Sequence, residues 1–202
     1  PYGVLIPKTK SDLIETINYA REAQIPLLAR GGGTSQCGQT VNEAIVIDNS
    51  KFLNKILDFN KEKMTCTVEP GIVLDELNRF LKPFGLWFPV DVSTSSRATI
   101  GGMTGNNSCG GRSIRYGMMR DNVLGIEAIL SNGSTYNFGK IENNHINLTH
   151  DPATKIISDL LKLAKDNQNE ILSKFPKVLR RVGGYNIDAL LPDAMALRPV
   201  SY

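Results

Sequence analysis

Glycine is concentrated in two short windows of this 202-residue chain, and that distribution constrains the fold more than any other feature. Ten of the 18 glycines fall within residues 31–38 and 101–117. Glycine adopts positive φ angles readily and lets backbone N–H groups approach a ligand with no Cβ in the way. Backbone amides that point inward form a nest for anions, above all for phosphates. The two windows therefore predict loops that surround a polar or anionic ligand.

The first 30 residues have the pattern of a βαβ unit. Residues 4–6 and 26–29 are apolar runs that predict strands, and the apolar spacing across residues 13–20 predicts a helix between them, capped by Ser11. A strand, a helix and a second strand within about 30 residues predict two parallel strands, because such a crossover returns the chain in the same direction.

Strands and a helix are also expected up to residue 85. Apolar runs predict strands over 44–48, 53–59 and 64–68, and then a helix that opens at Pro70-Gly71 and stops at Pro83 and Gly85. Residues 87–122 show almost no periodicity, although their composition is not of low complexity. That stretch predicts a long ordered loop, and loops of such length in compact domains are usually functional.

The remaining residues predict a hairpin and a helix. Strands over 123–130 and 135–138 are joined by Asn132-Gly133, which favours a type I′ turn. Asp151-Pro152 predicts the start of an amphipathic helix, because proline is favoured at the first helical position. Little regular structure is expected after Arg181.

The fold class expected from these elements is α+β, arranged in two lobes. Residues 1–85 would form an N-terminal lobe that contains the βαβ unit and the glycine loop at 30–38. Residues 86–202 would form a second lobe around a mixed or antiparallel sheet. The glycine loops would lie near the junction of the lobes.

The first glycine window has the chemistry of a phosphate-binding loop. Thr34 and Ser35 add hydroxyl donors beside the amides of residues 31–33. Hydrogen bonds to a charged partner are worth roughly 1.5–3 kcal/mol each, so three or four would anchor a diphosphate. A P-loop is excluded because no lysine follows, and a Rossmann fingerprint because Gln36 replaces its last glycine and a strand follows. A tight connection between strands is the alternative interpretation.

The second window is rich in amides, hydroxyls and carboxamides and poor in large apolar side chains. Such a segment suits the lining of a polar, planar ligand more than a core. Cys109 lies in a context that superficially resembles a hydrolase nucleophile motif, but Asn106 stands where a nucleophile elbow needs glycine. Cys37 and Cys109 are therefore expected to be small buried thiols beside the ligand.

Several motifs occur in the order found in a known family. They are Arg30-Gly-Gly-Gly-Thr-Ser35, Val68-Glu-Pro-Gly71, Pro89-x-Asp91, Thr99-Ile-Gly-Gly-Met103 with Asn106, and Tyr116-Gly-x-x-x-Asp121-Asn122. Together they resemble the FAD-binding domain shared by vanillyl-alcohol oxidase and p-cresol methylhydroxylase. Within that superfamily the chain is most similar to D-lactate, D-2-hydroxyglutarate and glycolate-oxidase-subunit-D type dehydrogenases. The motifs Gln36–Gln39, Asn106–Gly111 and Arg180–Tyr185 resemble bacterial members fused to an iron–sulfur segment, and the resemblance covers about residues 1–190.

The resemblance implies that both glycine windows bind FAD. The first loop would hold the pyrophosphate. The second window, with Pro89, would run along the pyrophosphate, the ribityl chain and the isoalloxazine edge, and Gly117 and Val123 would lie near the ribityl or adenine side. Family members that attach flavin covalently often use a histidine where this chain has Thr34, so non-covalent FAD is expected. The implied cofactor-binding residues are Arg30, Gly31, Gly32, Gly33, Thr34, Ser35, Gln36, Pro89, Asp91, Ser93, Thr99, Gly101, Gly102, Asn106, Gly110, Gly117, Asp121 and Val123.

The resemblance also implies an activity, namely dehydrogenation of a D-2-hydroxy acid by hydride transfer to flavin. The electron acceptor would be a quinone, a cytochrome or an iron–sulfur segment. The catalytic base and substrate ligands are expected outside this chain, as is any iron–sulfur cluster, because the 86–202 lobe stops before the rest of the FAD site and the cap domain. This chain alone is therefore expected to be inactive. Open alternatives are an FAD-dependent reductase or synthase of the same fold, and a non-catalytic nucleotide-binding module.

Composition narrows the partners and the compartment. The formal net charge is +3, without a basic block or an acidic tail, so nucleic acid is not indicated as a partner. Three cysteines give no disulfide framework and suggest a reducing, cytoplasmic setting, with contact to a membrane only through the electron acceptor. No apolar run approaches a membrane span. The histidines, His145 and His150, stand in polar surroundings and are expected at the surface, so no metal site is expected.

Overall fold

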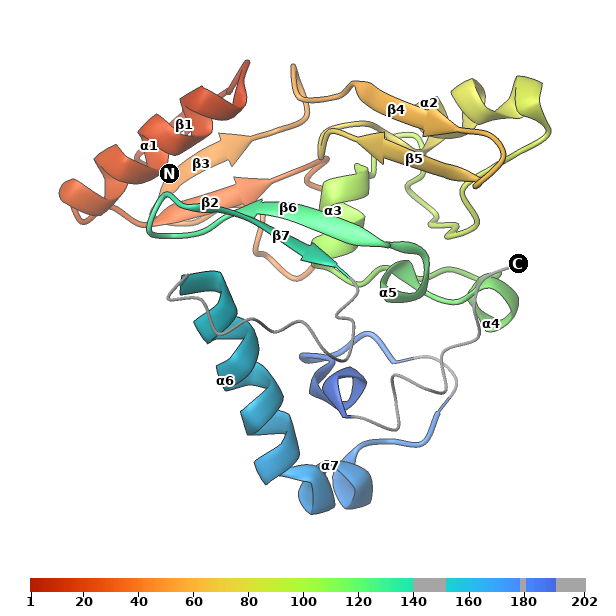
Figure 1. Ribbon diagram of the computed structural model, residues 1–202. Helices are drawn as coiled ribbons and strands as arrows, with labels where there is room; N and C mark the ends of the chain where they lie inside the picture. Colours follow the sequence, from red (N-terminus) through yellow and green to blue (C-terminus); the bar gives the residue numbers. More distant parts are fainter. Residues whose placement is uncertain (140–151, 179–180, 192–202) are drawn as a thin grey trace.

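The computed structural model describes residues 1–139, 152–178 and 181–191. Three strands, β1 (Gly3–Leu5), β2 (Leu27–Arg30) and β3 (Ile45–Asp48), form a parallel sheet in the order β1-β3-β2, and α1 (Lys10–Glu22) lies alongside it (Figure 1). The predicted parallel direction of β1 and β2 is confirmed. They are not neighbours, however, because β3 is inserted between them and pairs with both.

Helix α1 begins one residue after Thr9, and the prediction that Ser11 caps it is wrong. Thr9 Oγ1 accepts a hydrogen bond from Asp12 N (3.2 Å), and the Asp12 carboxylate accepts one from Thr9 N (2.9 Å). This reciprocal capping box needs an acceptor three residues after the cap. Three residues after Thr9 is Asp12, which can accept a hydrogen bond. Three residues after Ser11 is Ile14, which cannot.

The capping box makes the stability of α1 depend on pH. Backbone N–H groups of Lys8 and Thr9 donate to the Asp12 carboxylate and lower its pKa below the ordinary value. A lowered pKa in the folded state stabilises the fold above the unfolded pKa of about 4, and the stabilisation disappears as pH falls through the folded value. We expect Asp12→Asn to lower the thermal midpoint at pH 7, with a difference from wild type that shrinks below pH 4. Melting curves of both proteins between pH 7 and pH 2.5 measure this; a difference independent of pH would contradict it.

A second sheet and a helix follow the parallel sheet. Strands β4 (Ile56–Asn60) and β5 (Thr65–Val68) form an antiparallel hairpin, and α2 (Leu74–Leu81) leads into the 3₁₀ turn η1 (Lys82–Phe84). The helix was predicted to open at Pro70-Gly71 and begins later. The backbone of Val73 stays extended and bridges Thr99, and Ile72 O beside it accepts a hydrogen bond from Ile100 N (2.9 Å).

The stretch 87–122 is not the continuous loop that was predicted, since it contains α3 (Ile100–Gly105), α4 (Ser113–Tyr116) and α5 (Met119–Asn122). Because glycine has low helix propensity, the glycines of α3 made a helix look unfavourable from the sequence alone. Tertiary contacts stabilise it instead. Thr99 caps its first turn by accepting from Gly102 N (3.3 Å), and Ile100 and Met103 are buried.

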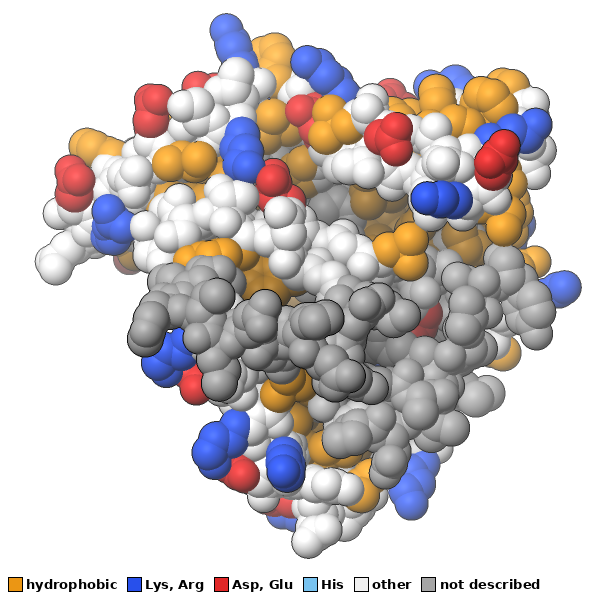
Figure 2. Space-filling view, in the orientation of Figure 1, with side chains coloured by type: hydrophobic (Ala, Val, Ile, Leu, Met, Phe, Trp, Pro, Cys, Tyr) orange, Lys and Arg blue, Asp and Glu red, His pale blue; other side chains and the backbone are white. Residues whose placement is uncertain are grey.

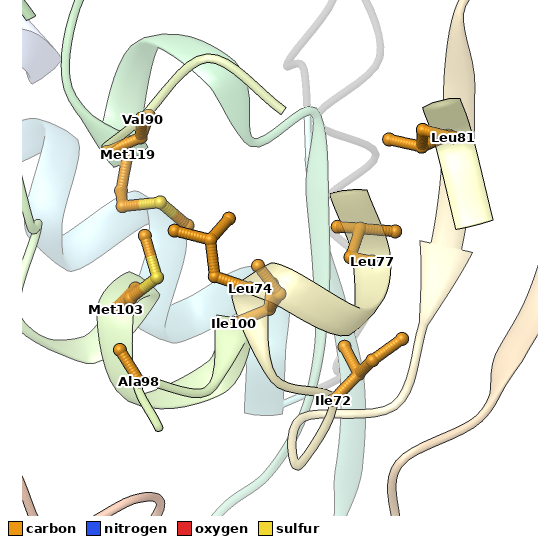
Figure 3. Packing of buried hydrophobic residues seen from close by; sticks show 9 residues of the cluster. All are labelled: Ile72, Leu74, Leu77, Leu81, Val90, Ala98, Ile100, Met103 and Met119. Carbon is orange, nitrogen blue, oxygen red and sulfur yellow. The ribbon is translucent and has the colours of Figure 1, made fainter. Parts of the chain in front are cut away.

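The main core joins α2, α3 and α5. Figure 3 shows Leu74, Ile100, Met103 and Met119 pointing toward one another from these three helices, with Val90 beside Met119. Leu77 and Leu81 extend the same core along α2 toward the β4–β5 hairpin. The core thus fixes α3, whose opposite face is left exposed.

The last antiparallel pair is β6 (Gly125–Ile129) with β7 (Thr135–Gly139), and its turn is not type I′. A type I′ turn needs positive φ at both central residues. Gly133 has φ 81°, but Asn132 is not among the non-glycine residues with positive φ. Leu130 N donates to Ser134 O (2.9 Å) and Gly133 N to Leu130 O (2.9 Å), so the loop has three residues and ends on glycine.

Helices α6 (Pro152–Asp166) and α7 (Gln168–Lys174) pack with η2 (Ile187–Leu190) around a small core of Ala164, Ile171 and Leu191. Pro152 opens α6 as predicted, and η2 adds a short turn where little structure was expected. Arg120 joins this unit to α5, since its Nη1 lies 2.7 Å from Asn186 Oδ1 and 3.9 Å from Asp188 Oδ2. His145, His150, Asp151 and Arg180 lie outside the described residues.

The described surface is mixed in charge. On the face shown in Figure 2, Lys and Arg side chains alternate with Asp and Glu across the sheet layer and α6. None of the described helices is both long enough and apolar enough to cross a bilayer.

Candidate functional site

A cleft of about 560 Å³ lies where the two glycine windows meet. Its walls are the carboxyl ends of β2 and β3 on one side and α3 with the segment before it on the other. Small-molecule sites commonly have volumes of roughly 300–1,000 Å³. The size and the polar walls therefore suit a cofactor-sized ligand.

Most of the predicted site residues line this cleft. They are Arg30, Gly31, Gly32, Gly33, Thr34, Ser35, Gln36, Ser93, Thr99, Gly101, Gly102 and Asn106. The structure does not bring Pro89, Asp91, Gly110, Gly117, Asp121 and Val123 to its lining.

In the first loop, glycine is required by contacts within the protein. A Cβ on Gly31 would lie 2.1 Å from Thr99 Oγ1, and one on Gly32 would lie 2.2 Å from the carbonyl oxygen of Arg97. The first loop therefore packs directly on the segment that leads into α3. Its glycines allow this close approach, and the same glycines line the cleft.

The guanidinium group of Arg30 lies under the same loop. Gly33 has φ 64°, and a Cβ there would lie 2.4 Å from Arg30 Nη2. The cation is thus held against the loop that carries the amides. A cation beside backbone donors favours an anionic ligand.

Helix α3 presents small residues to the cleft. Ile100 faces the core and Met103 borders both the core and the cleft, whereas Gly102, Gly105 and Asn106 line the cleft. A Cβ on Gly105 would meet nothing within 4 Å. The space in front of Gly105 is therefore open, and a ligand can occupy it.

Two buried polar atoms at the cleft lack a hydrogen-bond partner among the described residues. They are Arg30 Nε and Asn49 Oδ1. An unsatisfied buried donor or acceptor destabilises a fold by about 1–3 kcal/mol, more when charged. Both atoms are buried while the cleft is empty, so a ligand would supply the missing partners only if the two side chains turn toward it. The residues present therefore fit a phosphate-bearing cofactor.

Sequence reasoning missed Asn49 as a site residue. It follows Asp48, the last residue of β3, and the carboxyl ends of parallel strands are where ligands bind in such sheets. The position after the 44–48 run was therefore a usable signal. Further cleft residues that were not predicted are Ala29, Gln39, Thr40, Pro70, Val92, Thr94, Ala98, Met103, Gly105 and Ser108.

The predicted residues away from the cleft make contacts within the protein. Asp91 Oδ1 accepts from Arg112 N (3.0 Å), and a Cβ on Gly110 would lie 1.7 Å from the Asp91 carbonyl oxygen. Asp121 Oδ2 accepts from Met118 N (2.8 Å), and Val123 packs against the main core. These contacts shape the loops behind α3, and direct cofactor contacts of these residues stay a prediction.

The prediction of two buried thiols is wrong for Cys37, which is exposed, whereas Cys109 is half-buried. Cys37 lies in the turn beyond the first loop, outside the cleft lining. The third cysteine, Cys66, packs against the main core, and burial raises the pKa of its thiol.

The sequence matches a known family and named relatives, and the fold matches solved structures. The pattern of the FAD binding domain family matches residues 1–139. The chain is 36% identical over 201 residues to the D-2-hydroxyglutarate dehydrogenase of Pantoea ananatis, covering 96% of this chain and 20% of that protein. It is 34% identical over 140 residues to the glycolate oxidase subunit GlcD of Bacillus subtilis, covering 69% of this chain and 30% of that subunit.

A solved structure supports the fold. The 6-hydroxy-D-nicotine oxidase of Arthrobacter nicotinovorans superposes with a TM-score of 0.62 at 19% identity, covering 71% of this chain and 31% of that one. The chain spans about a fifth of the length of the dehydrogenases that it matches. From its sequence pattern and its fold, this chain belongs to the FAD-binding domain family and has the p-cresol methylhydroxylase-type architecture expected from its motifs.

Proposed function

We propose that the cleft binds FAD without a covalent bond, and that the chain is the flavin-binding part of an oxidoreductase acting on a 2-hydroxy acid. Family membership and the names of the related dehydrogenases support the cofactor and the substrate class. The observation that carries the proposal is the pair of buried unsatisfied atoms, Arg30 Nε and Asn49 Oδ1, beside a loop of backbone donors. Thr34 stands where covalent members often have histidine, which supports non-covalent binding.

The residues of the chain would act by binding and orienting. The amides of residues 31–34 and the Ser35 hydroxyl would donate to pyrophosphate oxygens, and Arg30 would add positive charge behind them. The open face of α3 would receive the rest of the cofactor. When bound, FAD supplies the hydride acceptor for oxidation of the substrate carbon.

The identity of the substrate and of the electron acceptor is inferred from the sequence motifs. We infer a D-2-hydroxy acid as substrate and a quinone, a cytochrome or an iron–sulfur segment as electron acceptor. The catalytic base and substrate ligands would come from outside this chain, and residues 1–85 and 86–202 would be its two lobes. The free thiols of all three cysteines support a reducing, cytoplasmic setting.

Titration with FAD tests the proposal. The quenching of flavin fluorescence measures the binding. We expect saturable binding of FAD and release of intact FAD when the protein is denatured. NADPH should not compete. The proposal would be overturned if the chain bound no flavin at FAD concentrations well above the dissociation constant of a weak complex. That result would favour a module with another role.

The intact protein tests the substrate class. The flavin should be bleached anaerobically by D-2-hydroxyglutarate or D-lactate. Bleaching by NADPH alone would indicate a reductase of the same fold instead.

A further inference from the structure

We propose that Asn49, together with Arg30, recognises a hydrogen-bond donor that lies next to a phosphate on the bound nucleotide. The inference rests on the proposed FAD function and deepens it. Asn49 would thus be a specificity residue that separates a nucleotide from a bare phosphate.

The two residues stand side by side at the end of the parallel sheet. Strands β2 and β3 pair Arg30 with Asp48, and Asn49 N donates to Arg30 O (3.0 Å). Both residues line the cleft. One wall therefore presents a cationic donor beside a carboxamide.

The backbone that carries Asn49 is held on both sides. Asp48 Oδ1 accepts from Ser50 N (2.9 Å) and from Ser50 Oγ (2.6 Å), which fixes the turn after β3. Gly71 packs so closely that a Cβ there would lie 2.0 Å from Asn49 O. The unsatisfied side-chain oxygen therefore belongs to an ordered position. The oxygen is buried while the cleft is empty, so under this proposal the Asn49 side chain turns about its terminal torsion, which has broad energy minima, when the ligand binds.

The missing partners are of opposite kinds. Arg30 Nε is a donor and needs an acceptor, which a phosphate oxygen supplies. Asn49 Oδ1 is an acceptor and needs an N–H or O–H group, which a fully ionised phosphate lacks. A sugar hydroxyl or an amino group close to the phosphate meets the second need. FAD carries such groups in both halves, so ADP and FMN are the two possible sources.

The proposal predicts different responses from two variants. Asn49→Leu should weaken FAD binding by about tenfold, the factor expected when one buried acceptor loses its donor. The same variant should leave competition by inorganic pyrophosphate unchanged, whereas Arg30→Met should weaken FAD and pyrophosphate alike. Loss of ADP affinity in Asn49→Leu would place the donor in the adenosine half, and loss of FMN affinity would place it in the flavin half.

Ligand-free stability separates recognition from a structural role. Removing an unsatisfied buried acceptor should leave the melting temperature of the ligand-free protein unchanged or higher. Asn49→Ala serves as a second variant if leucine does not fit. Asn54→Leu, at an exposed asparagine after the same strand, is the matched control and should bind FAD as wild type does.

Two results would overturn the inference while leaving the FAD function intact. One is a wild-type protein that binds FAD with an affinity that Asn49→Leu and Asn49→Ala do not change. The other is a large loss of ligand-free stability in both variants, which would make Asn49 a structural residue. A wild-type protein that binds no FAD would overturn both proposals.

Discussion

Gly105→Leu is expected to weaken FAD binding by about two orders of magnitude, or ~2.7 kcal/mol, without loss of ligand-free stability. Gly105 lines the cleft at the end of α3, and a Cβ there meets nothing within 4 Å. The leucine side chain would therefore fill space that only a ligand needs. Leucine also has a higher helix propensity than glycine, so the empty protein should melt at the same or a higher temperature.

This substitution is more informative than one in the first glycine loop. Any side chain at Gly32 would press on the Arg97 carbonyl oxygen, so flavin loss there would report damaged packing as well as blocked binding. Gly3→Leu is the control, because Gly3 is also open on all sides and lies on the edge strand β1, away from the cleft. Unchanged FAD affinity in Gly105→Leu would show that the cofactor does not lie against α3.

Gly110→Ala should lower the free energy of unfolding of the ligand-free protein by about 1–3 kcal/mol, the usual range of overpacking. The added Cβ would lie 1.7 Å from the carbonyl oxygen of Asp91 and 2.4 Å from its Oδ1. A backbone oxygen cannot rotate away, so the loop itself must shift. Urea unfolding without flavin measures the effect.

The neighbouring glycine provides the matched control. A Cβ on Gly111 would lie 3.8 Å from Asp91 Oδ2, an ordinary contact, so Gly111→Ala should stay within about 0.5 kcal/mol of wild type. If Gly110→Ala were as stable as Gly111→Ala and merely lost flavin, Gly110 would be a cofactor contact and not a packing residue.

Local patterns in the sequence were enough to identify most of the fold. The runs at 26–29, 44–48 and 64–68 are β2, β3 and β5 to within one residue, because short apolar runs between polar turns have few other solutions. The first glycine loop was placed correctly for a similar reason. Consecutive glycines after a strand are unusual enough to predict a close backbone approach.

The rest depends on contacts between distant parts of the chain. Nothing local shows that β3 inserts between β1 and β2, since the order of strands is set by packing. Helix α3 contains three glycines and forms through the Thr99 cap and the burial of Ile100 and Met103. Asn49 becomes a candidate only when the fold places it beside Arg30 with an unsatisfied oxygen.

A crystal structure of the chain soaked or grown with FAD would locate the cofactor relative to the first glycine loop and α3. We expect pyrophosphate oxygens at about 3 Å from the amide nitrogens of residues 31–34, with the cofactor against Gly105 and a donor on Asn49 Oδ1. FAD bound elsewhere on the chain, or a cleft left empty at saturating FAD, would contradict this expectation.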